Sequence, residues 1–171
     1  MRTVLGVIVS TLLVAGCAGA TSSAPPAAPA TAAANPSQSG AFGGTIQFKM
    51  DGKAATTTVE GVADGSNVSG TAVTQLGGST HNVKLECASQ NGDTWALGGK
   101  IADTTVSGEK AGDWSAVVVK SGSPQKVGIW LSDDPSSGAD CNAWLKAIDF
   151  ATIGIENFHA VDSGTLTPPV G

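Results

Sequence analysis

Residues 45–62 read TIQFKMDGKAATTTVEGV, and this stretch decides the fold class. Apolar residues alternate with polar ones in its first part, at Ile46, Phe48 and Met50. This two-residue period is typical of a strand with one buried face. Asp51-Gly52 follows as a tight-turn pair, and residues 56–62 then return to β-branched Thr and Val. The stretch therefore predicts an antiparallel β-hairpin.

The same signals recur along the chain, where short runs rich in Val, Ile and Thr alternate with Gly, Asp and Asn. Further strands are expected at residues 67–75, 81–88, 94–102, 114–120 and 127–132, and a last one within 156–161 or 164–167. Gly98-Gly99 interrupts one run and predicts a kink or bulge. Residues 141–150 are the one helix candidate. The pattern predicts an all-β fold, an antiparallel β-sandwich or small β-barrel of about eight strands with that short helix.

Charge and composition narrow the class of partner. The 171 residues carry a net charge of −5, and only 13% of them are charged, about half the share of a typical globular domain. Without Arg2, the eight lysines and fourteen acidic residues give −6, and the lysines are scattered. Nucleic acids and anionic membrane surfaces bind clustered Lys and Arg, so neither is expected as a partner of the domain.

The first residues, MRTVLGVIVSTLLVAGC, combine a basic start, a short apolar run and the sequence Val14-Ala15-Gly16-Cys17. The apolar run is too short to span a bilayer as a helix. The ending resembles the lipobox of bacterial lipoproteins. That resemblance implies a signal peptide at 1–16 and a Cys17 that becomes the acylated, palmitate-bearing N-terminus. The alternative is an ordinary secretory signal cleaved nearby, after Ala18 or Ala20.

Residues 17–40 are expected to form a linker. After Cys17 they contain no charge, four prolines and nine alanines, and the prolines oppose helix formation. Acyl chains at Cys17 would anchor the protein to the outer face of the cell membrane. The linker would then hold a β domain, residues 41–171, in the extracytoplasmic space.

The other two cysteines, Cys87 and Cys141, are expected to form a disulfide. An exported chain meets an oxidising environment, and two cysteines allow a single intramolecular pairing. Free thiols or a metal site are the alternatives, although two cysteines without nearby histidines make a poor zinc site.

Part of the domain resembles a β-rich module of secreted actinobacterial proteins whose role is uncharacterised. The resemblance is carried by residues 83–87, 91–101, 117–120, 132–135, 140–141 and 158–167, which form strands, turns and the Cys pair. It implies a fold and a secreted location, and it carries no activity.

No catalytic or metal-binding motif stands out. His81 and His159 are the available bases, and neither belongs to a Gly-x-Ser-x-Gly elbow or an HExxH pattern. Both are interpreted as residues on strand surfaces. The acidic stretch 133–140 lacks the spacing of an EF-hand and is interpreted as a solvated turn. The chain is therefore expected to be no enzyme and to need no cofactor or metal.

The four tryptophans, Trp95, Trp114, Trp130 and Trp144, are candidate ligand-binding residues, with core packing as the alternative. Exposed rings would stack on cell-wall sugars, and rings lining a cavity would contact an apolar ligand. The favoured function is a membrane-anchored, non-enzymatic binding or structural module of the cell envelope. The alternatives are a carrier of a small apolar ligand or lipid in a β-barrel or sandwich cavity, and a hydrolase in which His81 or His159 meets a carboxylate and a Ser or Thr.

Overall fold

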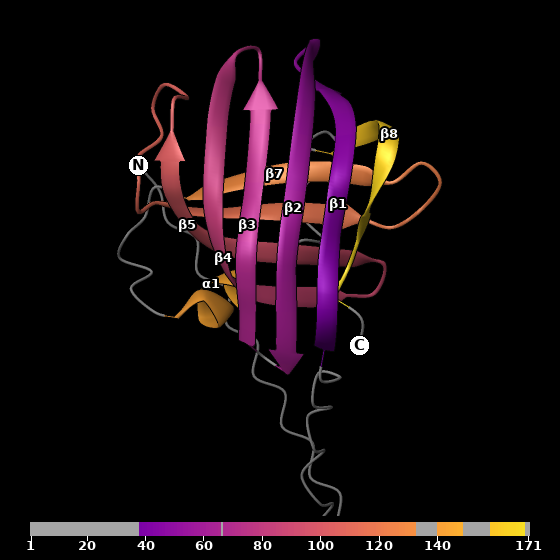
Figure 1. The fold of residues 1–171 in the computed structure, drawn as a ribbon, viewed down its shortest axis with the longest axis vertical. Helices are drawn as coiled ribbons and strands as arrows, with labels where there is room; N and C mark the ends of the chain where they lie inside the picture. The colour runs from indigo at the N-terminus through magenta and orange to yellow at the C-terminus, as the bar shows by residue number, and fades with distance from the viewer. Residues whose placement is uncertain (1–37, 66, 133–139, 149–157, 170–171) are drawn as a thin grey trace, which may run out of the picture. The chain divides into compact units, whose positions relative to one another are not determined.

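The computed structural model describes residues 38–65, 67–132, 140–148 and 158–169. These residues form eight strands and one helix: β1 (Gln38–Met50), β2 (Lys53–Gly65), β3 (Asn67–Leu76), β4 (Ser79–Asn91), β5 (Thr94–Thr104), β6 (Trp114–Lys120), β7 (Lys126–Ser132), α1 (Cys141–Ala147) and β8 (His159–Thr167). Figure 1 shows β1 to β4 side by side, with β6 and β7 crossing behind them.

The strands close into an antiparallel barrel in sequence order, because β8 pairs with β1. The all-β prediction is confirmed, and of the two architectures it named, the closed barrel is the one found. The seam between β7 and β8 is the narrowest, since only Lys126 with Ala160 and Val127 with His159 are paired there. Closure leaves both edges of β1 hydrogen-bonded, which removes the open edge that a sheet would otherwise expose.

The barrel interior is filled by alternating side chains from all eight strands. Its largest fully buried members are Phe48, Ile46, Leu85, Leu97, Leu166, Val59, Val83, Val117, Val119 and Val127. The hairpin predicted at 45–62 is confirmed: Asp51 and Gly52 take positive φ at the turn, and Ile46 and Phe48 point inward. This interior is the main hydrophobic core.

A β-bulge on β4 redirects the chain at the position where the second core begins. Leu85 is opposite Gly99 and Cys87 is opposite Gly98, so Glu86 is the extra residue. Leu85 therefore belongs to the interior core, whereas Cys87 belongs to a second core on the outer face. A Cβ on Gly99 would collide with the carbonyl oxygen of Lys84. The irregularity predicted at Gly98-Gly99 is thus found, with the inserted residue on the neighbouring strand.

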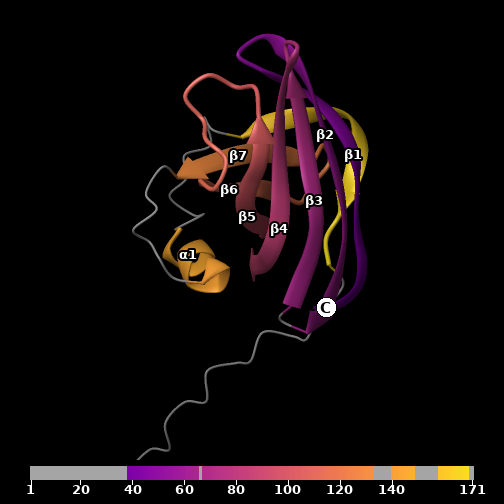
Figure 2. The same cartoon turned by 60° about the vertical axis from the view of Figure 1, so that its left-hand side comes forward.

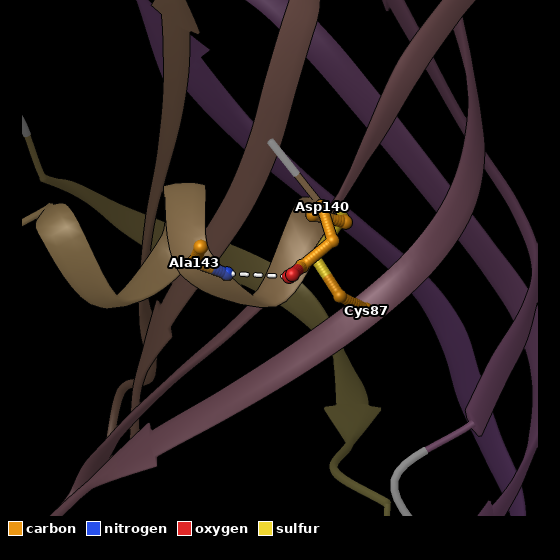
Figure 3. The surroundings of a disulfide bond; sticks show 4 residues. Cys87, Asp140 and Ala143 are labelled. Atoms are coloured by element: carbon orange, nitrogen blue, oxygen red, sulfur yellow. Dashed lines mark hydrogen bonds between the residues drawn. A yellow bond between two sulfur atoms is a disulfide. The ribbon is translucent and has the colours of Figure 1, made fainter. Parts of the chain in front are cut away.

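The helix α1 covers the outer face of the barrel next to β4 and β5 (Figure 2). Its first residue, Cys141, forms a disulfide with Cys87, as predicted, and the preceding Asp140 side chain accepts a hydrogen bond of 2.8 Å from the Ala143 amide (Figure 3). This capping bond satisfies one of the free amides at the start of the helix. Trp144 and Leu145 are buried against the barrel.

Three boundaries differ from the sequence-based expectation. β1 begins at Gln38, inside the stretch expected to be linker, because Ser39 and Gly40 already pair with β2. The predicted helix at 141–150 ends at Ala147, and its residues 149 and 150 lie outside the described part. The last strand spans 159–167, so it joins parts of both expected segments. Within the described residues, no helix has the length and hydropathy needed to cross a bilayer.

Candidate functional site

A row of polar side chains crosses one end of the otherwise apolar interior. Thr57 on β2 is opposite Thr74 on β3, Thr74 is opposite His81 on β4, and His81 is opposite Thr104 on β5. The Thr57 and Thr74 hydroxyls are 2.9 Å apart and both residues are buried. Buried hydroxyls and imidazoles are costly unless they are hydrogen-bonded, so this row depends on its internal partners.

His81 is the centre of this polar row, because both of its ring nitrogens have partners. Its Nδ1 lies 2.6 Å from Oε2 of Glu109, and its Nε2 lies 2.9 Å from Oγ of Ser115. Thr104 Oγ1 donates to the same carboxylate oxygen at 2.7 Å. The Ser115 residue is 0% exposed and His81 is 4% exposed, while the Glu109 side chain keeps 12% exposure. We call these four residues the His81 cluster.

The chemistry of the cluster assigns the hydrogen-bond directions. An ionised carboxylate only accepts, so His81 Nδ1 donates to Glu109. If the imidazole is neutral, Nε2 accepts from the Ser115 hydroxyl; if it is an imidazolium, Nε2 donates and the hydroxyl turns around. The neutral imidazole therefore gives the buried Ser115 hydroxyl an acceptor while both ring nitrogens of His81 keep a partner.

Glu109 reaches the cluster from the connection between β5 and β6, residues 105–113. The ends of this loop are tied to neighbouring strands, with Thr105 N donating to Thr80 O at 2.9 Å and Gly112 N to Ile101 O at 2.8 Å. Between these ties, residues 107, 108, 110 and 111 are exposed, Val106 is partly buried, and the Glu109 side chain reaches His81. The loop thus contributes one side chain to the barrel end.

Ser, His and Glu in this order also form the nucleophile, base and orienting acid of many hydrolases. Here Ser115 is completely buried on an interior strand position, between His81 and the packed core. A substrate carbonyl must approach such a hydroxyl to within about 3 Å, and burial prevents that in this conformation. The arrangement observed can hold charge and hydrogen bonds, and the loop would have to move before Ser115 could react.

The structure corrects the interpretation of His81 as a strand surface residue. His81 shares the inward face of β4 with Val83 and Leu85, which occupy the next alternate positions. His159 lies apart from it on β8, partly exposed, with its ring 6.0 Å from that of Phe48. The two histidines therefore do not form a common site.

The four tryptophans divide between the two cores. Trp95 is buried inside the barrel, and its indole nitrogen has no hydrogen-bond partner among the described residues. Trp114 on β6 and Trp144 on α1 stack with their ring centroids 5.2 Å apart, and Trp130 packs partly buried against the same cluster. Three of the four candidate binding residues thus gather on one outer face, mostly as packing around the helix.

Other predicted sites have simpler outcomes. Cys17 and most of the acidic stretch, residues 133–139, lie outside the described residues, and Asp140 serves as the helix cap. In the described part of the chain, no three His, Cys, Asp or Glu side chains gather as metal ligands.

Together, fold and site define an eight-stranded antiparallel barrel with an apolar interior and a polar cluster at one end. In the comparisons with known proteins, no family model, curated protein or solved structure matches this chain.

Sequence reasoning missed Ser115, Glu109 and Thr104, because they come from three separate segments and follow no spacing rule. One signal did point to His81: positions 81, 83 and 85 alternate as His, Val and Leu, which places the imidazole on the apolar face. A His on that face needs buried partners, and the chain supplies them from β6 and the 105–113 loop.

Proposed function

We propose that this protein is a lipid-anchored extracytoplasmic module that serves the cell envelope by binding or as a structural part. Cys17, diacylated after removal of residues 1–16, holds it to the outer face of the membrane. The leader, the lipobox-like ending and the charge-free linker support this location. A disulfide between Cys87 and Cys141 fits an oxidising compartment.

The observation that carries the binding or structural role is the packed interior. Side chains from all eight strands fill it, and many of them have no exposure at all. A barrel of this size either fills with side chains or holds one small ligand. The filled interior favours a rigid body that presents its outer surface and loops to partners. No catalytic step is needed for that role.

The anchor is tested by comparing wild type with Cys17→Ser in the native host. Wild type is expected in the membrane fraction and in the detergent phase of a Triton partition. The variant is expected in the aqueous phase or as the unprocessed precursor, because acyl chains provide the attachment. Ser23→Ala, in the same linker, is the matched control. Unchanged partitioning of Cys17→Ser would remove the anchor from the proposal.

A carrier of a small apolar ligand is the second candidate, and one observation favours it. The indole N–H of Trp95, which has no hydrogen-bond partner among the described residues, lies in the barrel interior and offers a donor to a bound acceptor. Native mass spectrometry of protein from its own host separates the two candidates. The proposed module gives the mass of the acylated, disulfide-bonded chain alone, whereas a carrier shows additional, dissociable mass.

A further inference from the structure

The Glu109 carboxylate occupies a position that the barrel itself constructs. His81 on β4 and Thr104 on β5 direct two donors to the same oxygen, at 2.6 and 2.7 Å, and neither donor belongs to the loop that carries Glu109. We propose that His81 and Thr104 form a carboxylate-binding site which the chain's own Glu109 occupies, and that a small monocarboxylate takes its place when the 105–113 loop swings out. This inference rests on the proposed binding role and gives it a ligand class.

The donors remain in position without Glu109. His81 is fixed by Ser115 through its other nitrogen and is buried among interior side chains of the barrel. Thr104 ends a strand that pairs with β4 at this point, and its hydroxyl also lies 3.2 Å from the carbonyl oxygen of Thr80 on β4, which shares the single hydroxyl proton with Glu109 and keeps the hydroxyl oxygen in place. Because the two donors come from adjacent paired strands, their separation is set by the sheet. Such a preorganised pair suits an anionic oxygen.

Moving the 105–113 loop away from the barrel costs less free energy than detaching a strand. Its backbone is bonded to neighbouring strands only near its ends, and the central bonds, such as Glu109 N to Val106 O at 3.4 Å, stay within the loop. Its middle residues, 107, 108, 110 and 111, are exposed. Val106 is its only large apolar residue and is just partly buried. Segments with few buried apolar contacts open at lower free-energy cost than the barrel around them. The inward-turned Glu109 is then the main tie between the loop centre and the barrel.

The size of the ligand follows from the surroundings. The Glu109 side chain keeps 12% exposure, so its position borders the solvent, whereas Ser115 behind His81 is closed off. A ligand can therefore place its carboxylate where that of Glu109 lies, with its remaining atoms in the space that the loop vacates. A monocarboxylate with an unbranched body meets both conditions, and a bulky molecule does not.

The first experiment vacates the site in the full-length protein by Glu109→Ala. Melting temperatures are measured in sodium acetate, butyrate or octanoate against sodium chloride at equal ionic strength. A carboxylate that fills the vacancy should raise the melting temperature by about 4 °C at a tenfold excess over its dissociation constant. Glu109→Gln is the matched control, since its amide fills the same space and should abolish the difference between the salts.

The second experiment uses wild type and needs no variant to fold. Hydrogen exchange of the 105–113 segment is followed with and without octanoate, and faster exchange of this segment alone is expected, because a ligand that takes the place of Glu109 frees the loop. If none of the three carboxylates stabilises Glu109→Ala beyond chloride, the site is not one for carboxylates. If the variant responds but the hydrogen exchange of wild type never changes, Glu109 stays bound to His81 and Thr104 in wild type. The proposal that a carboxylate ligand displaces it is then disproved. Neither result depends on Cys17, so the anchor is judged separately.

Discussion

The side chain of Gln125 pairs with the backbone of Leu166 as a neighbouring strand would. Its Nε2 donates to Leu166 O at 3.0 Å, and its Oε1 accepts from Leu166 N at 3.0 Å. Gln125 O also accepts from Val161 N at 2.9 Å. These bonds lie next to the seam where only two residue pairs join β7 to β8. Gln125 therefore supplies much of the hydrogen bonding that closes the barrel there.

Replacing Gln125 with Ala should therefore weaken the barrel at its narrowest seam. Two partly buried hydrogen bonds are lost, and we expect a stability decrease of about 1–3 kcal/mol in urea unfolding. Gln75→Ala, at an exposed position on β3, is the control and should change stability by less than about 0.5 kcal/mol. Equal effects of the two variants would show that Gln125 does not contribute to closure.

Gly98→Ala should disturb the helix without altering the barrel interior. A Cβ there would lie 2.9 Å from Leu145 Cγ and 3.0 Å from both Cys87 Sγ and Trp144 Cζ3. Overpacking of this kind costs about 1–3 kcal/mol, and near-ultraviolet dichroism should report the displaced Trp144. Combining it with Leu145→Ala should cost less than the sum of the single variants, since the nearest colliding atom is removed. If the stability losses of the two single variants simply add in the double variant, the predicted contact between position 98 and Leu145 is contradicted.

The Cys87–Cys141 disulfide should contribute about 4 kcal/mol, because it closes a loop with a sequence separation of 54. Urea unfolding of wild type is compared with the Cys87→Ala/Cys141→Ala double variant, and the lower midpoint of the variant gives the difference. Thiol titration of the unfolded, unreduced wild type should find neither of these cysteines free. Detection of both thiols would disprove the bond.

Thr57→Val should destabilise more than the double variant Thr57→Val/Thr74→Val. The single change leaves the buried Thr74 hydroxyl without its partner, at a cost of about 1–3 kcal/mol, whereas removing both hydroxyls preserves shape and leaves none unpaired. Thr45→Val, in the exposed Thr45–Thr58 pair, should cost less because water replaces the lost partner. The order of the three unfolding midpoints in urea checks the prediction.

Ser115 should not react with a fluorophosphonate probe in the folded protein. It is fully buried although His81 Nε2 lies 2.9 Å away, so the reagent does not reach the hydroxyl. Intact-mass measurement after incubation should show no adduct. An adduct mapped to Ser115, and lost in Ser115→Ala, would instead assign hydrolase chemistry to the His81 cluster.

Much of the fold could be predicted because its signals are local. The alternation at 45–50 and the Asp51-Gly52 turn define the first hairpin, and Trp114–Lys120 was predicted with the bounds that β6 has. Closure could not be predicted, since it depends on a glutamine side chain at Gln125 and on pairing between β1 and β8, more than a hundred residues apart. Local patterns contain no information on such contacts.

The candidate site was less predictable for the same reason. An expected export to an oxidising compartment and an even count of the remaining cysteines were enough to predict the pairing of Cys87 with Cys141. The His81 cluster, in contrast, needs the register shift at Ala102 on β5 that places Thr104 opposite His81, an inward position on β6 and a loop glutamate, and only the folded chain brings these together. The burial of Trp114 likewise depends on a distant segment, because Trp144 of α1 stacks on it.

The position of β1 has a mechanical consequence. It is hydrogen-bonded to β2 along its whole length and to β8 from Gly43 to Phe48. A force applied along the axis of this strand would have to break both sets of hydrogen bonds together. The chain therefore enters the barrel through a strand that resists extraction, a property that the proposed anchor at its amino end would require.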